Sequence, residues 1–181
     1  MLKDFTYTVE AKWNVIKIDT TQSNDKSIMI NDGIKVDLNI KIPKTVKNIT
    51  VTTNVGNITS ENINCEFDAS VNVGDINIRN SNCLYNVKTD VGDIKLDNCI
   101  ISGKSEFNTS TGDVNISADN ISDAQNIYAE TQVGNINMSL PESSSYKADI
   151  NEFMKTQRTE TNGDGKTVIK LVANVGKISF Q

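Results

Sequence analysis

The phrases Asn72-Val73-Gly74-Asp75-Ile76 and Asp90-Val91-Gly92-Asp93-Ile94 lie 18 residues apart and differ at a single position. Versions of this phrase recur along the chain, and they place six glycines at equivalent positions: Gly56, Gly74, Gly92, Gly112, Gly134 and Gly176. Successive glycines are 18, 18, 20, 22 and 42 residues apart. A period of about 20 residues is typical of solenoids, in which each repeat forms one coil.

The residues before each glycine alternate between apolar and polar, as in a strand with one buried face. Apolar residues predominate seven, five, three and one positions before the glycine, for example Phe67, Ala69, Val71 and Val73 before Gly74. They recur two and four positions after it, so the parity changes at the glycine. One regular strand cannot bury both sets, and we therefore predict a corner at each glycine, where a positive φ is allowed.

Composition supports an all-β fold. The chain of 181 residues contains 22 Ile, 15 Val and 17 Thr against 6 Leu and 7 Ala. β-branched residues fit pleated strands, so this balance excludes helix bundles and coiled coils. We expect a single-stranded β-solenoid, a right-handed β-helix of about six coils, because like residues recur at equal offsets in every unit. An antiparallel meander of the same units is the alternative, although each of its hairpins would want a tight two-residue turn.

A single domain with distinct ends is expected, since solenoid caps must cover open strand edges. The three parts are N-terminal capping strands at 1–47, repeat coils at 48–140, and a C-terminal hairpin with the last coil at 141–181. The N-terminal part includes strands near Phe5–Val9 and Trp13–Ile18. It also includes a hairpin of Ser27–Ile30 and Ile34–Ile42 around the Asp-Gly turn at Gly33. In the C-terminal part, Tyr146–Phe153 and Lys166–Ala173 are expected to pair as strands across the charged stretch at 155–160.

Charge and residue types exclude several classes of function. The net charge of −5 and the pI near 4.8 weigh against binding to nucleic acid, which needs a basic surface. No apolar stretch approaches the roughly 20 residues of a membrane span, and the first residues lack the apolar core of a secretory signal. The absence of His excludes the usual Ser–His–Asp and Cys–His nucleophiles and His-ligated metals. We therefore expect no enzymatic activity, no cofactor and no direct membrane insertion.

Three carboxylates directly follow the glycine in successive repeats: Asp75, Asp93 and Asp113. Stacked coils would place them in a row about 5 Å apart, where like charges repel. A Ca²⁺ ion held by their oxygens is one way to relieve the repulsion. The interpretation we favour is that each side chain hydrogen-bonds its own corner backbone as an Asx turn.

Cysteine usage leaves two alternatives. Cys65 and Cys83 occupy the same offset in consecutive repeats, nine residues after the glycine, and Cys99 is the third cysteine. Stacking would bring the first two within disulfide range. Buried free thiols that behave as small apolar side chains are the interpretation we favour.

The Val-Gly-Asp-Ile phrases, together with Gly163-Asp164-Gly165 and Asn174-Val175-Gly176-Lys177-Ile178 near the end, resemble a family of bacterial adhesin-like domains of unknown function. In that family, short Gly-Asp-Ile phrases mark each coil of a β-strand repeat. The resemblance covers residues 30–181 and implies a single-stranded β-helix in an envelope-associated or secreted protein. It offers no catalytic residues to transfer to this chain.

From this resemblance we expect a non-catalytic, adhesin-like binding module of the bacterial surface or envelope. Its partner would be a surface glycan or a protein, and the chain would be a monomer or a weak oligomer. The expected location is the cell envelope or the extracellular space, with the cytoplasm as the alternative because no signal or anchor is seen. A filament-forming scaffold is a second possibility. A polysaccharide-active enzyme that uses the Asp row with Arg79 is a third.

Overall fold

The computed structural model describes residues 5–12, 15–22, 37–155 and 157–181. The chain divides into two compact units, Met1–Lys41 and Ile42–Gln181. In the first unit, β1 (Phe5–Lys12) pairs in antiparallel fashion with β2 (Val15–Gln22), as the sequence predicts for strands in this region. Most of the hairpin predicted around Gly33 falls in residues 23–36, outside the described residues. Its second strand was expected to reach Ile42, but residues 37–42 are described and form no strand. The capping role of residues 1–47 stays a prediction.

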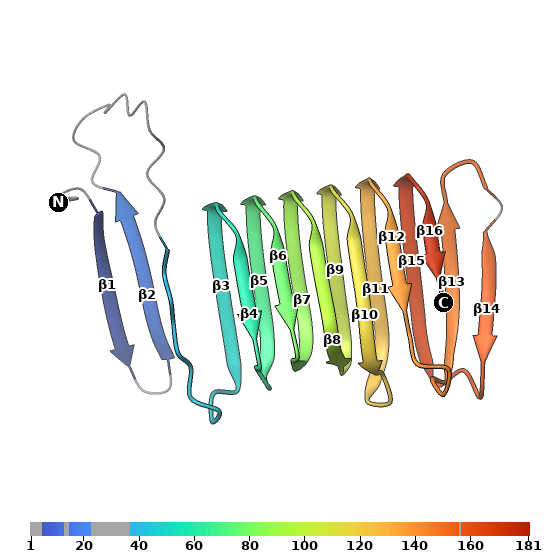
Figure 1. Cartoon of the computed structure of the whole chain (residues 1–181), viewed down its shortest axis with the longest axis horizontal. Coiled ribbons are helices and arrows are strands. Elements are labelled where there is room, and N and C mark those ends of the chain that lie inside the picture. Colours follow the sequence, from blue (N-terminus) through green and yellow to red (C-terminus); the bar gives the residue numbers. More distant parts are fainter. Residues whose placement is uncertain (1–4, 13–14, 23–36, 156) are drawn as a thin grey trace. The chain divides into compact units, whose positions relative to one another are not determined.

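The second unit is a stack of six coils, each made of a long strand, a corner and a short strand (Figure 1). The long strands are β3 (Asn48–Val55), β5 (Glu66–Val73), β7 (Asn82–Val91), β9 (Gly103–Thr111), β11 (Ala124–Val133) and β15 (Thr167–Val175). The short strands are β4 (Ile58–Glu61), β6 (Ile76–Arg79), β8 (Ile94–Ile101), β10 (Val114–Asn120), β12 (Ile136–Ser139) and β16 (Ile178–Phe180). Within the described residues no helix is long and apolar enough to cross a membrane.

Equivalent strands of successive coils pair in parallel, with equivalent residues in register. Val71 of β5 is paired with Thr89 of β7, which in turn is paired with Thr109 of β9. The short strands follow the same rule, with Ile76 of β6 paired with Ile94 of β8. Parallel register confirms the predicted β-solenoid of about six coils, because a meander of the same units would pair them in antiparallel fashion.

The core lies between the two sheets and is filled by the inward rows of both strand types. The aromatic rings of Tyr85 and Phe107 are fully buried, with their centroids 5.8 Å apart. Ile76 and Ile94 face them from the short strands without exposure to solvent. Side chains three, five and seven positions before the glycine and two and four after it are mostly buried, as the alternation predicts.

The C-terminal part departs from simple stacking. After β12 the chain forms β13 (Tyr146–Glu152) and β14 (Arg158–Asn162), which pair as an antiparallel hairpin. β15 then lies between β11 and β13, and it is parallel to both. The two segments expected to pair therefore do so, but in parallel. Part of the stretch expected to be a charged connector instead forms β14, the last strand of the long-strand sheet at the C-terminal end.

Candidate functional site at the glycine corner

All six repeat glycines lie at the corner between a long and a short strand, with φ between 140° at Gly56 and 155° at Gly176. L-residues rarely adopt this conformation, which explains the change of parity in the sequence. The glycines also stack closely: a Cβ on Gly112 would lie 2.0 Å from the carbonyl oxygen of Gly92. Gly56, in the first coil, is the exception, since a Cβ there would approach no other atom closer than 3.8 Å.

Buried threonines tie the corners of successive coils together. In three coils a threonine hydroxyl donates a hydrogen bond to the glycine carbonyl of the preceding coil. These bonds, 2.9–3.0 Å long, run from Thr89 to Gly74, from Thr109 to Gly92 and from Thr131 to Gly112. In these three coils the buried hydroxyl is thus satisfied by the preceding layer of the stack.

The residues that follow the glycines form a second ladder, which we call the Asx ladder: Asn57, Asp75, Asp93, Asp113, Asn135 and Lys177. Asp93 N donates to Asp75 Oδ1 at 2.9 Å, and Asp113 N donates to Asp93 Oδ1 at 2.7 Å. The same contact joins every successive pair in the ladder. The predicted Asx turn, in which each side chain bonds the backbone of its own corner, is therefore wrong. Each Oδ1 accepts instead from the backbone N–H of the next coil.

Each aspartate of the ladder uses one carboxylate oxygen in this way. Among the residues that the structure describes, no group of three or more His, Cys, Asp or Glu side chains is arranged to hold a metal ion. A Ca²⁺ ion at Asp75, Asp93 and Asp113 stays a prediction. The structural contacts of these side chains explain their recurrence without an ion.

We expect the triple variant Asp75→Asn, Asp93→Asn, Asp113→Asn to fold with unchanged or slightly higher stability, by up to about 1 kcal/mol. Asparagine keeps the Oδ1 acceptor, as Asn57 and Asn135 do in the same ladder, and it removes the repulsion between adjacent carboxylates. The matched triple alanine variant loses three acceptors and should be less stable than wild type by about 1–3 kcal/mol. Urea unfolding measures both changes. A large loss in the asparagine variant, or stabilisation of the wild type alone by Ca²⁺, would instead favour a metal at the ladder.

The side chains directly before the glycines are exposed, contrary to the prediction from the alternating pattern. These positions were expected to face the core, yet Val55 is 78% exposed and Val73, Val91, Val133 and Val175 are each about half exposed. The strand has already begun to turn at this point, so the alternation of the preceding residues no longer holds. The result is a row of apolar side chains on the outside of the corner, beside the Asx ladder.

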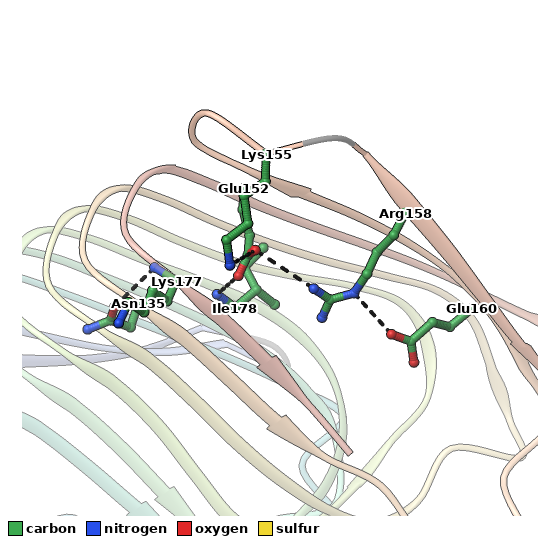
Figure 2. A network of polar contacts seen from close by, with 7 residues as sticks. All are labelled: Asn135, Glu152, Lys155, Arg158, Glu160, Lys177 and Ile178. Atoms are coloured by element: carbon green, nitrogen blue, oxygen red, sulfur yellow. Dashed lines mark hydrogen bonds and ion pairs between the residues drawn. The ribbon is translucent and has the colours of Figure 1, made fainter.

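At the last coil a side chain takes the place of the missing next layer. In the inner coils, the N–H two residues after the glycine donates to a carbonyl of the next coil, as Ile136 does to Lys177. Ile178 has no further coil, and its N–H donates instead to Glu152 Oε1 at 2.5 Å (Figure 2). Glu152 is 5% exposed, and its Oε2 lies 2.6 Å from Lys155 Nζ and 3.7 Å from Arg158 Nη1. The ammonium group of Lys155 and the N–H of Ile178 hold the pKa of the Glu152 carboxyl below its usual range.

All three cysteines are free thiols in the structure. Cys65 directly precedes Glu66 and Cys83 directly precedes Leu84, and these neighbours are paired in register. Burial raises the pKa of the Cys83 thiol to about 12, so it is protonated at neutral pH. The favoured interpretation of buried free thiols therefore holds for Cys83, and Cys99 is buried as well, whereas Cys65 is only partly buried.

A second row of special backbone conformations was not recognised in the sequence. Asn62, Asn80 and Asn98 each lie six residues after a glycine, with φ between 49° and 57°. Asparagine tolerates this left-handed conformation, so its recurrence at one offset is the signal that would have identified a second corner. These residues border an open groove of about 780 Å³, which Ile63 and Ile100 also line.

Arg79, the basic residue considered for catalysis, lies apart from the Asx ladder. It ends β6, four residues after Asp75, a separation of roughly 13 Å along a strand. Its neighbours in register are Glu61 and Asp97. The structure therefore does not bring the basic group and the carboxylate row together.

Parallel coils, corner glycines and internal ladders define this chain as a β-solenoid repeat protein. The model of the Toastrack DUF4097 family matches residues 15–180, and the chain belongs to this family, whose function is unknown. No curated protein and no solved structure matches the chain significantly. The fold and the family are consistent with a non-catalytic interaction or structural module.

Proposed function

We propose that this chain is a non-catalytic, adhesin-like binding module of the bacterial surface or envelope. The observation that carries the proposal is the continuity of the outward rows at the glycine corner. The row before the glycine is valine in five of the six coils, and the row after it is Asp or Asn in five of the six, on a backbone fixed by hydrogen bonds between coils. Such a surface can contact an extended partner at several equivalent points without rearrangement.

The alternatives receive less support from the structure. A filament built end to end needs matching parallel edges, but at the C-terminal end the long-strand sheet finishes in β14, which runs antiparallel to the long strands. At the same end, the Glu152 carboxylate occupies the position of a further coil beside β16. A polysaccharide-active enzyme that used the Asp row with Arg79 would need the two close together, but Arg79 lies four residues along the strand from Asp75.

Protease shaving of intact cells tests the proposed location. An antibody to this domain follows the native protein in its host after cell fractionation and after mild protease treatment. We expect the domain in the envelope or secreted fraction, and we expect it to be cleaved while a cytoplasmic marker survives. Lysed cells serve as the control that the domain is cleavable. A domain that fractionates with the cytosol and survives shaving would contradict the surface role.

A further inference from the structure

The apolar row outside the glycine corner is a continuous surface feature, which we call the valine ridge. It consists of Val55, Val73, Val91, Thr111, Val133 and Val175. Successive members belong to adjacent strands and are paired in register, as Val73 is with Val91. Five of the six are valines that expose about half or more of their surface. Contiguous exposed apolar side chains are typical of interaction sites.

The spacing of the ridge favours one type of secondary structure in a partner. Adjacent strands lie about 4.8 Å apart, so the six coils place the ridge over roughly 24 Å. A helix lying along it presents one apolar side chain per turn of about 5.4 Å, close to this spacing. An extended strand presents same-face side chains about 6.7 Å apart, so its side chains no longer match the spacing of about 4.8 Å between ridge residues after two coils.

The charges beside the ridge indicate which sign the partner carries. On one side of the ridge lies the Asx ladder, with Asp75, Asp93 and Asp113. On the other side lies the row of residues directly before the ridge, which contains Asp90. Within the two rows that flank the ridge, all of whose residues the structure describes, the one cation is Lys177 in the last coil. A partner with Lys or Arg beside its apolar stripe would complement the four carboxylates.

The same features argue against two other occupants. A second copy docked by its own ridge would bring the aspartate rows of both copies together. An anionic membrane would be repelled by the same carboxylates.

We propose that the valine ridge binds a cationic amphipathic helix of another protein. This proposal rests on the proposed function, because both require that the chain acts by binding a partner. It adds the surface and the class of partner: apolar side chains contact the central valines, and flanking Lys or Arg side chains pair with the carboxylates of the Asx ladder.

Binding of a model helix to the purified full chain tests the proposal. The probe is a fluorescent peptide of about 18 residues, which spans roughly 27 Å as a helix, with Leu at i, i+3, i+4 and i+7 spacing and Lys on both sides. The ridge variant is Val73→Ser with Val91→Ser and Val133→Ser. The matched control is Val168→Ser, because Val168 is 44% exposed on β15 but lies off the ridge.

We expect the ridge variant to bind the peptide about tenfold more weakly than wild type, with Val168→Ser unchanged. The asparagine triple variant of the Asx ladder should weaken binding by a similar factor, and a Glu-flanked peptide should not bind. No binding by wild type, or equal binding by the ridge variant, overturns the proposal. If the ridge variant still binds the peptide but no longer self-associates, the ridge binds a second copy instead. If it still binds the peptide but no longer binds anionic vesicles, the ridge binds a membrane instead. Because the assay uses purified protein, its failure leaves the shaving result unaffected.

Discussion

Gly112→Ala is expected to destabilise the solenoid by about 4 kcal/mol. Two costs combine at this position. The φ of 147° is strained for any L-residue, and the new Cβ would lie 2.0 Å from the carbonyl oxygen of Gly92. That oxygen belongs to the backbone of the preceding coil and already accepts a hydrogen bond from Thr109, so it cannot move without opening the stack.

Gly56→Ala is the matched control. Its φ of 140° carries nearly the same strain, but the nearest atom to its Cβ would be Thr53 Oγ1 at 3.8 Å. We expect a loss of about 1–2 kcal/mol from strain alone. Urea unfolding of both variants isolates the cost of close stacking as their difference. Equal losses in the two variants would show that the glycines serve the turn alone and not the contact between coils.

Glu152→Ala is expected to destabilise the protein by about 2–3 kcal/mol, mostly through one hydrogen bond. The variant leaves the N–H of Ile178 buried without an acceptor, at a cost of about 1–3 kcal/mol. Loss of the ion pairs adds less, because the side chains of Lys155 and Arg158 are 59% and 42% exposed and solvent screens them. Thermal or urea unfolding of the variant at neutral pH measures the sum.

The pH dependence separates charge from hydrogen bonding at this residue. The folded pKa of Glu152 is lower than its ordinary value of 4.5, so its stabilising charge is fully present above that pH. The contribution is lost as the pH falls through the folded pKa. Glu152→Gln keeps an oxygen acceptor for Ile178, so we expect a smaller loss of about 1 kcal/mol at neutral pH and a flatter acid limb. An acid limb identical to that of wild type would contradict the assigned role of the carboxylate.

Much of the fold was predictable because the same residue types recur at the same offsets from each corner glycine. In every unit the glycine marks the corner and the β-branched residues around it mark the two strands. Thr89 and Thr109 recur at one offset, three residues before the glycine, because each bonds the corner of the preceding coil. The odd coil at the C-terminus was not predictable in detail. β15 pairs with β11 as one repeat strand with another, but β13 on its other side carries no repeat phrase that would indicate the direction of pairing. A short strand such as β14 also leaves little sequence signal.

The surface was harder to predict than the core. Val73 and Val91 have the same residue type as buried positions, so hydrophobicity alone assigned them to the interior. Only the geometry of the corner shows that the strand turns before it reaches them. The role of Glu152 was also hidden, since its partner Ile178 lies 26 residues away and the bond forms only where the stack ends.

The central claim is that equivalent residues of successive coils lie side by side and so form continuous surfaces. Disulfide formation between introduced cysteines tests this directly. Val73→Cys with Val91→Cys joins neighbours in register about 4.8 Å apart, whereas Val73→Cys with Val133→Cys joins positions three coils apart, roughly 14 Å. Peptide mapping by mass spectrometry after mild oxidation should find the first disulfide in nearly all molecules and the second in almost none. Efficient formation of the second, or failure of the first, would contradict parallel stacking and with it the valine ridge.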